Sequence, residues 1–263
     1  MALSRELTDN IEGVLKASLR NKLQNYKPES MSMPFHNRLL GKNKFALCTF
    51  FHSLINNFGS SIFEPVGLAL AQKNFKMATA QARAGEQISS AAQVEIQKII
   101  DGLVTATATP NKKEEIERIR KVCQTGEMIT VKPTKVDLMF ESKDGAYFLF
   151  DIKTAKPNAG GFKEFKRTLL EWVAVILVNK PNANVNTFIA IPYNPYNPYE
   201  PEPYTRWTMR GMLDLENELK VADEFWDFLG GKNTYKDLLD CFERVGIELR
   251  DEIDAYFKRF TKK

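Results

Sequence analysis

The sequence is poor in the residues that build disulfide frameworks and histidine-based metal sites. Its 263 residues include three cysteines and two histidines. Cys48, Cys123 and Cys241 are far apart, and no pair has the spacing of a zinc knuckle. His36 and His52 are too far apart for an HExxH zinc site, which favours core or loop roles for them. We therefore expect reduced thiols in a cytoplasmic protein and no zinc.

Long apolar segments and nucleotide-binding glycine motifs are also missing. The longest apolar run lies near Leu169–Val178, contains Glu171 and is too short to span a bilayer. The N-terminus lacks the apolar stretch of a signal peptide. Neither a P-loop nor a dinucleotide-binding glycine motif occurs. We expect a cytoplasmic location and no membrane partner, while the net charge of +4 gives only weak support for a nucleic-acid partner.

Hydrophobic residues make up 43% of the chain, which is ordinary for a globular protein and sufficient for one large core. We predict a single domain over 1–263, with a helical part over about 1–125, an α/β core over about 126–192, a proline- and tyrosine-rich loop over about 193–212, and a helical part over about 213–263. The predicted fold class is α/β, with a central mixed sheet of about four to five strands flanked by helices.

The hydrophobic periodicity and the turn residues place the individual elements. Helices are predicted at Leu3–Asn25, Leu39–Phe58 (with Gly59 as the stop), Ser61–Arg83, Ser89–Leu103, Lys112–Gln124 and Phe162–Val178. Strands are predicted at Met128–Val131, Lys135–Phe140, Tyr147–Lys153 and Asn186–Pro192. Three helices, broken at Gly230-Gly231 and at Gly246, are predicted within Glu216–Phe260.

Three charged residues fall on two neighbouring predicted strands. Side chains at i and i+2 point to one face of a strand, so Asp151 and Lys153 lie together. Ser142–Gly145 is a good hairpin turn, and a three-residue loop at 143–145 puts Asp137 opposite Asp151, within the one residue that a bulge would shift. Carboxylates this close repel each other unless a cation holds them.

A hard divalent ion with oxygen ligands meets this need, and Mg²⁺ is the cofactor we expect at Asp137 and Asp151. Such an ion stabilises negative charge on a phosphodiester and lowers the pKa of a bound water. Lys153 would orient or deprotonate the attacking water, or neutralise the charge on the phosphate. The alternative is a surface salt bridge on a half-exposed strand. The upstream aspartate at hairpin spacing and the apolar flanks favour the catalytic interpretation.

The chain has Asp137, then thirteen residues, then Asp151-Ile152-Lys153. This arrangement resembles the signature of PD-(D/E)xK nucleases, although Val136 stands where that family has proline. The predicted strand–strand–strand–helix–strand order also resembles the core of that family. More specifically, the chain resembles TdeIII-type type II restriction endonucleases, in Pro34–Gly41, Ser61–Pro65, Val131–Asp137, Phe150–Pro157, Phe162–Trp172 and Arg206–Gly211.

The resemblance implies a sequence-specific enzyme that cuts both strands of a short, symmetric site in double-stranded DNA. It further implies a homodimer, Mg²⁺ as the cofactor and functional pairing with a DNA methyltransferase. Related nucleases often add an acidic residue from an N-terminal helix to the metal site, and Glu64 is our candidate for that residue. Glu64 fits equally well as a helix-start carboxylate before Pro65.

Basic residues near the predicted strands and in the proline-rich loop are candidates for DNA contacts. Lys166 and Arg167 follow the motif, where they would meet phosphates or form a solvated helix face. Pro192–Tyr204 with Arg206–Arg210 is a candidate for base reading, since arginine donates two hydrogen bonds to guanine. The loop equally fits a packed surface segment or a polyproline ligand. The predicted DNA-binding residues are Lys135, Lys156, Lys163, Arg206 and Arg210.

Three other functions are also compatible with the sequence. A structure-specific repair nuclease would share the chemistry but would cut branched or damaged DNA. A non-catalytic DNA-binding protein would bind DNA regardless of chelator and cut nothing. A proline-loop adaptor would not bind DNA at moderate salt.

Overall fold

The computed structural model describes residues 3–27, 33–133, 135–154, 157–194, 209 and 211–261. A five-stranded sheet in the order β1-β4-β5-β6-β7 forms its centre, with antiparallel and parallel pairs. These strands are β1 (Met77–Ala82), β4 (Val136–Glu141), β5 (Tyr147–Ile152), β6 (Val185–Ile191) and β7 (Leu219–Val221). A separate ribbon pairs β2 (Gln87–Ser89) with β3 (Met128–Thr130). The predicted α/β class, with a mixed sheet flanked by helices, is confirmed.

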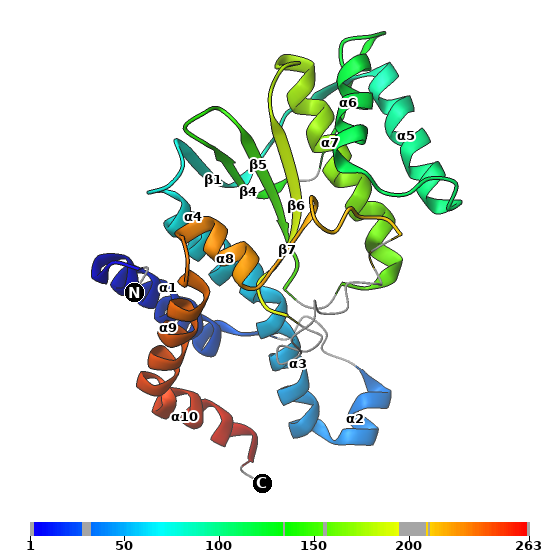
Figure 1. Cartoon of the computed structure of the whole chain (residues 1–263). Helices are drawn as coiled ribbons and strands as arrows, with labels where there is room; N and C mark the ends of the chain where they lie inside the picture. The colour runs from blue at the N-terminus through cyan, green and yellow to red at the C-terminus, as the bar shows by residue number, and fades with distance from the viewer. Residues whose placement is uncertain are drawn as a thin grey trace.

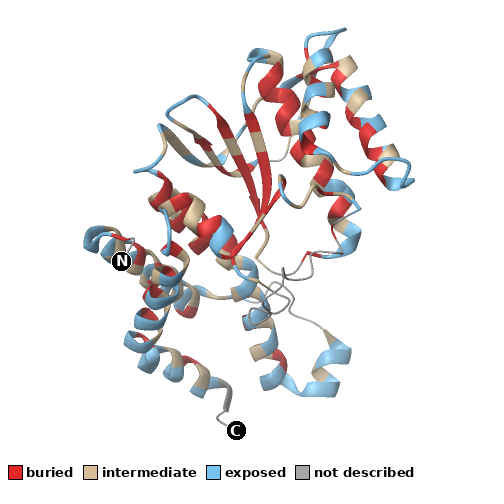
Figure 2. Cartoon of the chain, viewed as in Figure 1, coloured by how far each residue is buried: buried red, intermediate tan, exposed pale blue. Residues whose placement is uncertain are grey.

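Helices cover both faces of the sheet (Figure 1). One face carries α5 (Ser90–Val104), α6 (Lys112–Val122) and α7 (Phe162–Asn179). The other carries α4 (Glu64–Ala71) and α8 (Asp223–Gly230), backed by α1 (Arg5–Asn25) and α9 (Thr234–Glu248), while α10 (Arg250–Thr261) follows α9. Two apolar cores result, one on each face, and the strands between them are largely buried (Figure 2).

The β4–β5 hairpin forms as the sequence predicts. Leu138 pairs with Phe150, and the main chain closes the loop with a hydrogen bond from Ser142 N–H to Ala146 O. Gly145 takes a φ of +86°, which glycine adopts without a steric penalty. Helix α7 then carries the chain across to β6, which pairs in parallel with β5. These connections fix where Asp137 and Asp151 come to lie.

The helix predicted at Ser61–Arg83 is wrong in its second half. Helix α4 ends at Ala71, and Met77–Ala82 forms edge strand β1, which pairs antiparallel with β4. The alanine-rich sequence of β1 has helical propensity, but pairing with a distant strand overrides it. Strand β7 likewise lies within a stretch predicted as helical.

Two of the predicted helix ends also need correction. Gly59 does not stop the chain's helical path, because α3 (Lys42–Phe58) continues through a π-helical turn, η1 (Gly59–Phe63), into α4. Helix α9 runs through Gly246 to Glu248, whereas the break at Gly230-Gly231 occurs as expected. Within the described residues, no helix is both long and apolar enough to cross a bilayer.

Candidate active site

The three residues of the predicted catalytic motif come together where β4 begins and β5 ends. Extending the register of Leu138 with Phe150 puts Asp137 opposite Asp151. The Ile152 N–H donates a hydrogen bond to Asp137 Oδ2 at 2.7 Å, which ties the Asp137 carboxylate to β5. Lys153 Nζ lies 2.7 Å from Asp151 Oδ1. Two carboxylates and an ammonium group therefore share one end of the hairpin.

Helix α7 confines the Lys153 side chain. Its Nζ lies 4.5 Å from the centroid of the Phe165 ring, and 28% of the side chain is exposed. Asp151 is 9% exposed. A cation between a carboxylate and the face of an aromatic ring has few positions open to it. Lys153 is thus directed to the site, while part of its side chain remains open to an incoming substrate.

Glu64 reaches the same site from the other face of the sheet. It is 5% exposed and begins α4 directly after the π-helical turn. Gln81 links it to the site, because Gln81 Nε2 donates to Glu64 Oε2 at 2.8 Å and to Asp137 Oδ1 at 3.2 Å. The sequence carries no signal for Gln81, whose segment is predicted as helical.

The carboxyl groups of Asp137 and Glu64 resist ionisation. Burial raises the pKa of Asp137, the nearby charge of Asp151 raises it further, and the Ile152 N–H and Lys153 oppose the rise. Burial also raises the pKa of Glu64, against the hydrogen bond from Gln81. A carboxyl group with a folded-state pKa above its unfolded-state value destabilises the fold as the pH rises through that pKa. A bound cation would remove this cost.

The donor atoms suit a hard divalent cation, although they do not converge on a single point. Within the described residues, no group of three or more Asp, Glu, His or Cys side chains could hold a metal ion as it stands. The Gln81 amide lies between Glu64 and Asp137, and Lys153 pairs with Asp151. Adjacent carboxylate oxygens that repel each other are nevertheless the ligands that Mg²⁺ and Ca²⁺ prefer.

The basic residues predicted to contact DNA differ in exposure and in their partners. Lys135 is exposed just before β4, and Lys163 is exposed on α7. Arg167 donates to Gln97 Oε1 on α5 at 2.7 Å. The prediction for Lys166 is wrong, because its side chain is fully buried and ion-paired with carboxylates from α6 and the loop before β7. Lys156, Arg206 and Arg210 lie outside the described residues.

The two ends of the proline- and tyrosine-rich segment are anchored to the folded core, while 195–208 lies outside the described residues. Tyr193 Oη donates to Thr154 O at 2.9 Å, directly after Lys153. Trp226 Nε1 donates to Pro192 O at 2.8 Å. At the other end Met209 is fully buried in the core that contains α7. The segment therefore leaves the sheet next to the candidate site.

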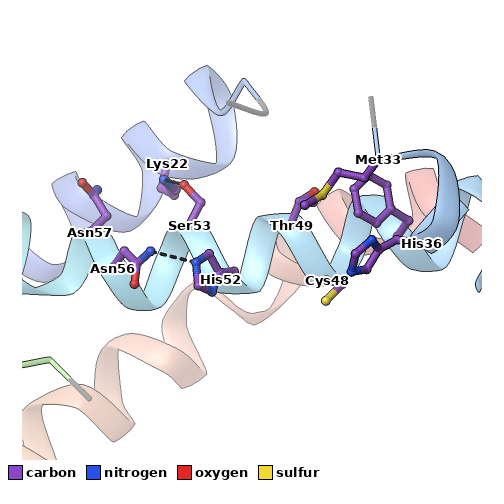
Figure 3. A pocket seen from close by; sticks show the side chains of 10 residues that line it. Lys22, Met33, His36, Cys48, Thr49, His52, Ser53, Asn56 and Asn57 are labelled. Carbon is purple, nitrogen blue, oxygen red and sulfur yellow. Dashed lines mark hydrogen bonds between the residues drawn. The ribbon is translucent and has the colours of Figure 1, made fainter. Parts of the chain in front are cut away.

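A cavity of about 610 Å³ lies elsewhere, along α3, between α1 and α2 (Pro34–Leu40) (Figure 3). His36, Cys48 and His52 line it, and His52 Nε2 pairs with Asn56 at 3.1 Å. None of the described residues that line this cavity carries a carboxylate, so they do not offer the ligands of a magnesium site. Both histidines are exposed on helices, contrary to the expected core or loop roles.

Comparison with known proteins identifies the family. The family model described as "Type II restriction endonuclease, HinfI" matches residues 3–246. The type II restriction enzyme HgiEI of Herpetosiphon aurantiacus is 29% identical over 84% of this chain and 79% of its own length. The type II restriction enzyme MjaII of Methanocaldococcus jannaschii is 28% identical over 93% of this chain and 72% of its own length.

These matches confirm the function class expected from the sequence, a site-specific deoxyribonuclease that acts on double-stranded DNA. Enzymes of this class generally use divalent metal ions. The finer resemblance to TdeIII-type enzymes stays a prediction. Because the family model covers nearly the whole chain, this protein belongs to the HinfI family of type II restriction endonucleases.

Proposed function

We propose that this enzyme hydrolyses DNA phosphodiester bonds with Mg²⁺ as the cofactor, and that Asp137, Asp151 and Lys153 carry out the reaction. The observation that carries the proposal is that these three side chains lie together where β4 begins and β5 ends. Asp137 and Asp151 would hold the ion, and Glu64 would join them as a third carboxylate. The raised pKa values of Asp137 and Glu64 support a cation here, because a cation makes their ionised forms stable.

Each side chain has its own role in the proposed reaction. A bound Mg²⁺ supplies positive charge that polarises the phosphate. Lys153 orients the attacking water or neutralises charge that develops on the phosphate, and its short contact with Asp151 fixes where the ammonium group lies. The Ile152 N–H holds the Asp137 carboxylate in place throughout. Lys135 and Lys163, both exposed, and Lys156 are assigned to phosphate contacts, and Arg206 and Arg210 to base reading.

A basic arm that reaches the site with one end supports DNA binding as well. Helices α2 and α3 (Pro34–Phe58) form this α2–α3 arm, and Ser30–Phe63 contains no Asp or Glu. Arg38, Lys42 and Lys44 are exposed on it and pair with no described acidic residue. Gly59 directly follows the arm, and a Cβ added there would lie 2.8 Å from Thr154 Cγ2. A phosphate backbone entering the site along this arm would meet cations and no carboxylate of the arm itself.

Replacing Arg38, Lys42 and Lys44 together with glutamine should weaken DNA binding and flatten its salt dependence. Each phosphate contact contributes about 0.9 to the slope of log K against log salt, so the slope should fall by about 2–3. The measurement is fluorescence anisotropy with a duplex, in an Asp151→Asn background that slows cutting. The matched control replaces three exposed lysines of α5 and α6, Lys98, Lys113 and Lys121. An unchanged slope in the arm variant would contradict the assignment.

A symmetric DNA site requires a symmetric protein, so we extend the proposal to a homodimer. Phe35 and Leu39 on α2 support this extension, because 83% and 84% of their surfaces are exposed. Apolar side chains this exposed suit burial against a second copy of the chain. A cytoplasmic location and functional pairing with a DNA methyltransferase complete the proposal, because an enzyme that cuts symmetric sites endangers the DNA of its own cell.

Digestion of a defined plasmid tests the proposed function. With Mg²⁺ we expect discrete fragments cut in both strands, and with EDTA we expect intact plasmid. A smear, or cutting confined to branched DNA, would favour a structure-specific repair nuclease instead. Intact plasmid with Mg²⁺, together with DNA binding that chelator does not change, would contradict the proposal and favour a non-catalytic DNA-binding protein.

A further inference from the structure

Gln81 has a backbone conformation that its position in a strand does not require. Its φ is +52°, in the left-handed region that residues other than glycine rarely adopt. Its neighbours Ala80 and Ala82 pair with Leu138 and Val136, whereas Gln81, opposite Asp137, forms no regular pair. A conformation of this kind costs free energy and persists only where its surroundings hold it. Such residues concentrate at functional sites, so the contacts of the Gln81 side chain indicate what the strained conformation serves.

The contacts of Gln81 are both with carboxylates of the candidate site. Its single amide nitrogen donates to Glu64 and to Asp137, at 2.8 and 3.2 Å. An amide nitrogen has two hydrogens, so this arrangement uses its full capacity. Glu64 belongs to α4 and Asp137 to β4, on different layers of the fold. Gln81 is thus the described side chain that bridges these two carboxylates.

We propose that Gln81 is a positioning residue that sets the affinity of the site for its divalent ion. The partial positive charge of the amide holds Glu64 and Asp137 close together while no cation is bound. This lowers the cost of bringing both carboxylates to the ion. The proposal rests on the proposed function, since it takes these carboxylates as the metal ligands. The strained backbone directs the amide between them, which an unstrained strand residue at this position would not do.

A glycine substitution separates the effect of the Gln81 amide from the effect of the backbone conformation. Glycine accepts a φ of +52° without strain, so Gln81→Gly should keep β1 in place while removing the bridge. Loss of a side chain that orients metal ligands typically weakens metal binding by about 10–100-fold. We expect at least a tenfold weaker affinity for Ca²⁺ and Mn²⁺, measured by isothermal titration without DNA. The melting temperature without metal should not fall.

Gln81→Glu provides the opposite test, because it keeps the size of the side chain and adds a carboxylate beside those of Glu64 and Asp137. We expect a lower melting temperature in EDTA than for wild type, and a larger rise on adding Ca²⁺. Gln93→Glu adds the same charge at an exposed position on α5 and should change neither value. This control separates the local effect from a change in net charge.

The outcomes distinguish the positioning role from a structural one. Wild-type Ca²⁺ affinity in Gln81→Gly would overturn the proposal, whether or not its melting temperature falls. An absence of Ca²⁺ and Mn²⁺ binding by the wild type would overturn it as well. Ion binding that depends on Gln81, in a wild type that cuts no DNA, would support the positioning role and contradict the proposed function.

Discussion

Lys153→Met and Asp151→Asn are each expected to slow DNA cleavage by about 10²–10⁴-fold, the range that a positioned acid–base or charge-stabilising group contributes. Lys153→Met removes the ammonium group that lies 2.7 Å from Asp151, and Asp151→Asn removes one of the two central carboxylates. The measurement is the single-turnover rate on a duplex that contains one cleavage site, at saturating Mg²⁺. DNA binding should survive in both variants, since the proposed phosphate contacts of Lys135 and Lys163 remain.

The hairpin offers controls with the same changes in chemistry. Lys143 and Asp144 are exposed in the loop at the far end of the β4–β5 hairpin. Lys143→Met and Asp144→Asn change charge by the same amounts and should cut at close to the wild-type rate. Cleavage by Lys153→Met at the wild-type rate would contradict a role for Lys153 in the reaction. The same result for Asp151→Asn would contradict metal binding by Asp151.

Lys166→Met is expected to destabilise the enzyme by about 3–5 kcal/mol, the usual effect of breaking a buried ion pair. Lys166 is fully buried, and its Nζ pairs with Glu115 and, at 2.6 Å, with Glu218. Lys112, also buried, pairs with Glu218 at 3.0 Å. Burial alone would raise the pKa of Glu218, but Lys112 and Lys166 lower it overall, so the carboxylate stays charged. Without Lys166, two buried carboxylates share one cation.

Urea denaturation followed by circular dichroism measures this loss. Lys163→Met is the matched control, because Lys163 lies one turn earlier on α7 and is exposed. Its stability should stay within about 0.5 kcal/mol of wild type, as for most surface substitutions. Equal stability of the two variants would show that the buried cluster adds nothing to the fold. A Lys163→Met variant that binds DNA more weakly would in addition support its assigned phosphate contact.

The hairpin that carries Asp137 and Asp151 was predictable because its geometry is local. Alternation along a strand puts Asp151 and Lys153 on one face, and Gly145 supports a three-residue loop. These two rules bring Asp137 opposite Asp151 without reference to the rest of the chain. The helix after the hairpin and the buried strand β6 followed from periodicity for the same reason.

Contacts between distant segments were not predictable in this way. Met77–Ala82 has the composition of a helix, and it becomes a strand because the edge of β4 is available for pairing. Lys166 shares a face of α7 with Phe162 and Leu169, and its charge is tolerated there only because Glu115 and Glu218 arrive from α6 and the loop before β7. A charged side chain is stable inside a protein only where partners balance it, and one segment of sequence does not show those partners.

The sequence by itself determined the α/β class and the grouping of Asp137, Asp151 and Lys153, because both follow from short-range periodicity and a turn. Only the tertiary structure decided that Gln81 bridges Glu64 and Asp137, and that Lys166 supports the core instead of meeting DNA. The physical reason is the same in both cases. Burial and hydrogen bonding depend on which surfaces meet, and that is set by the packing of helices on both faces of the sheet.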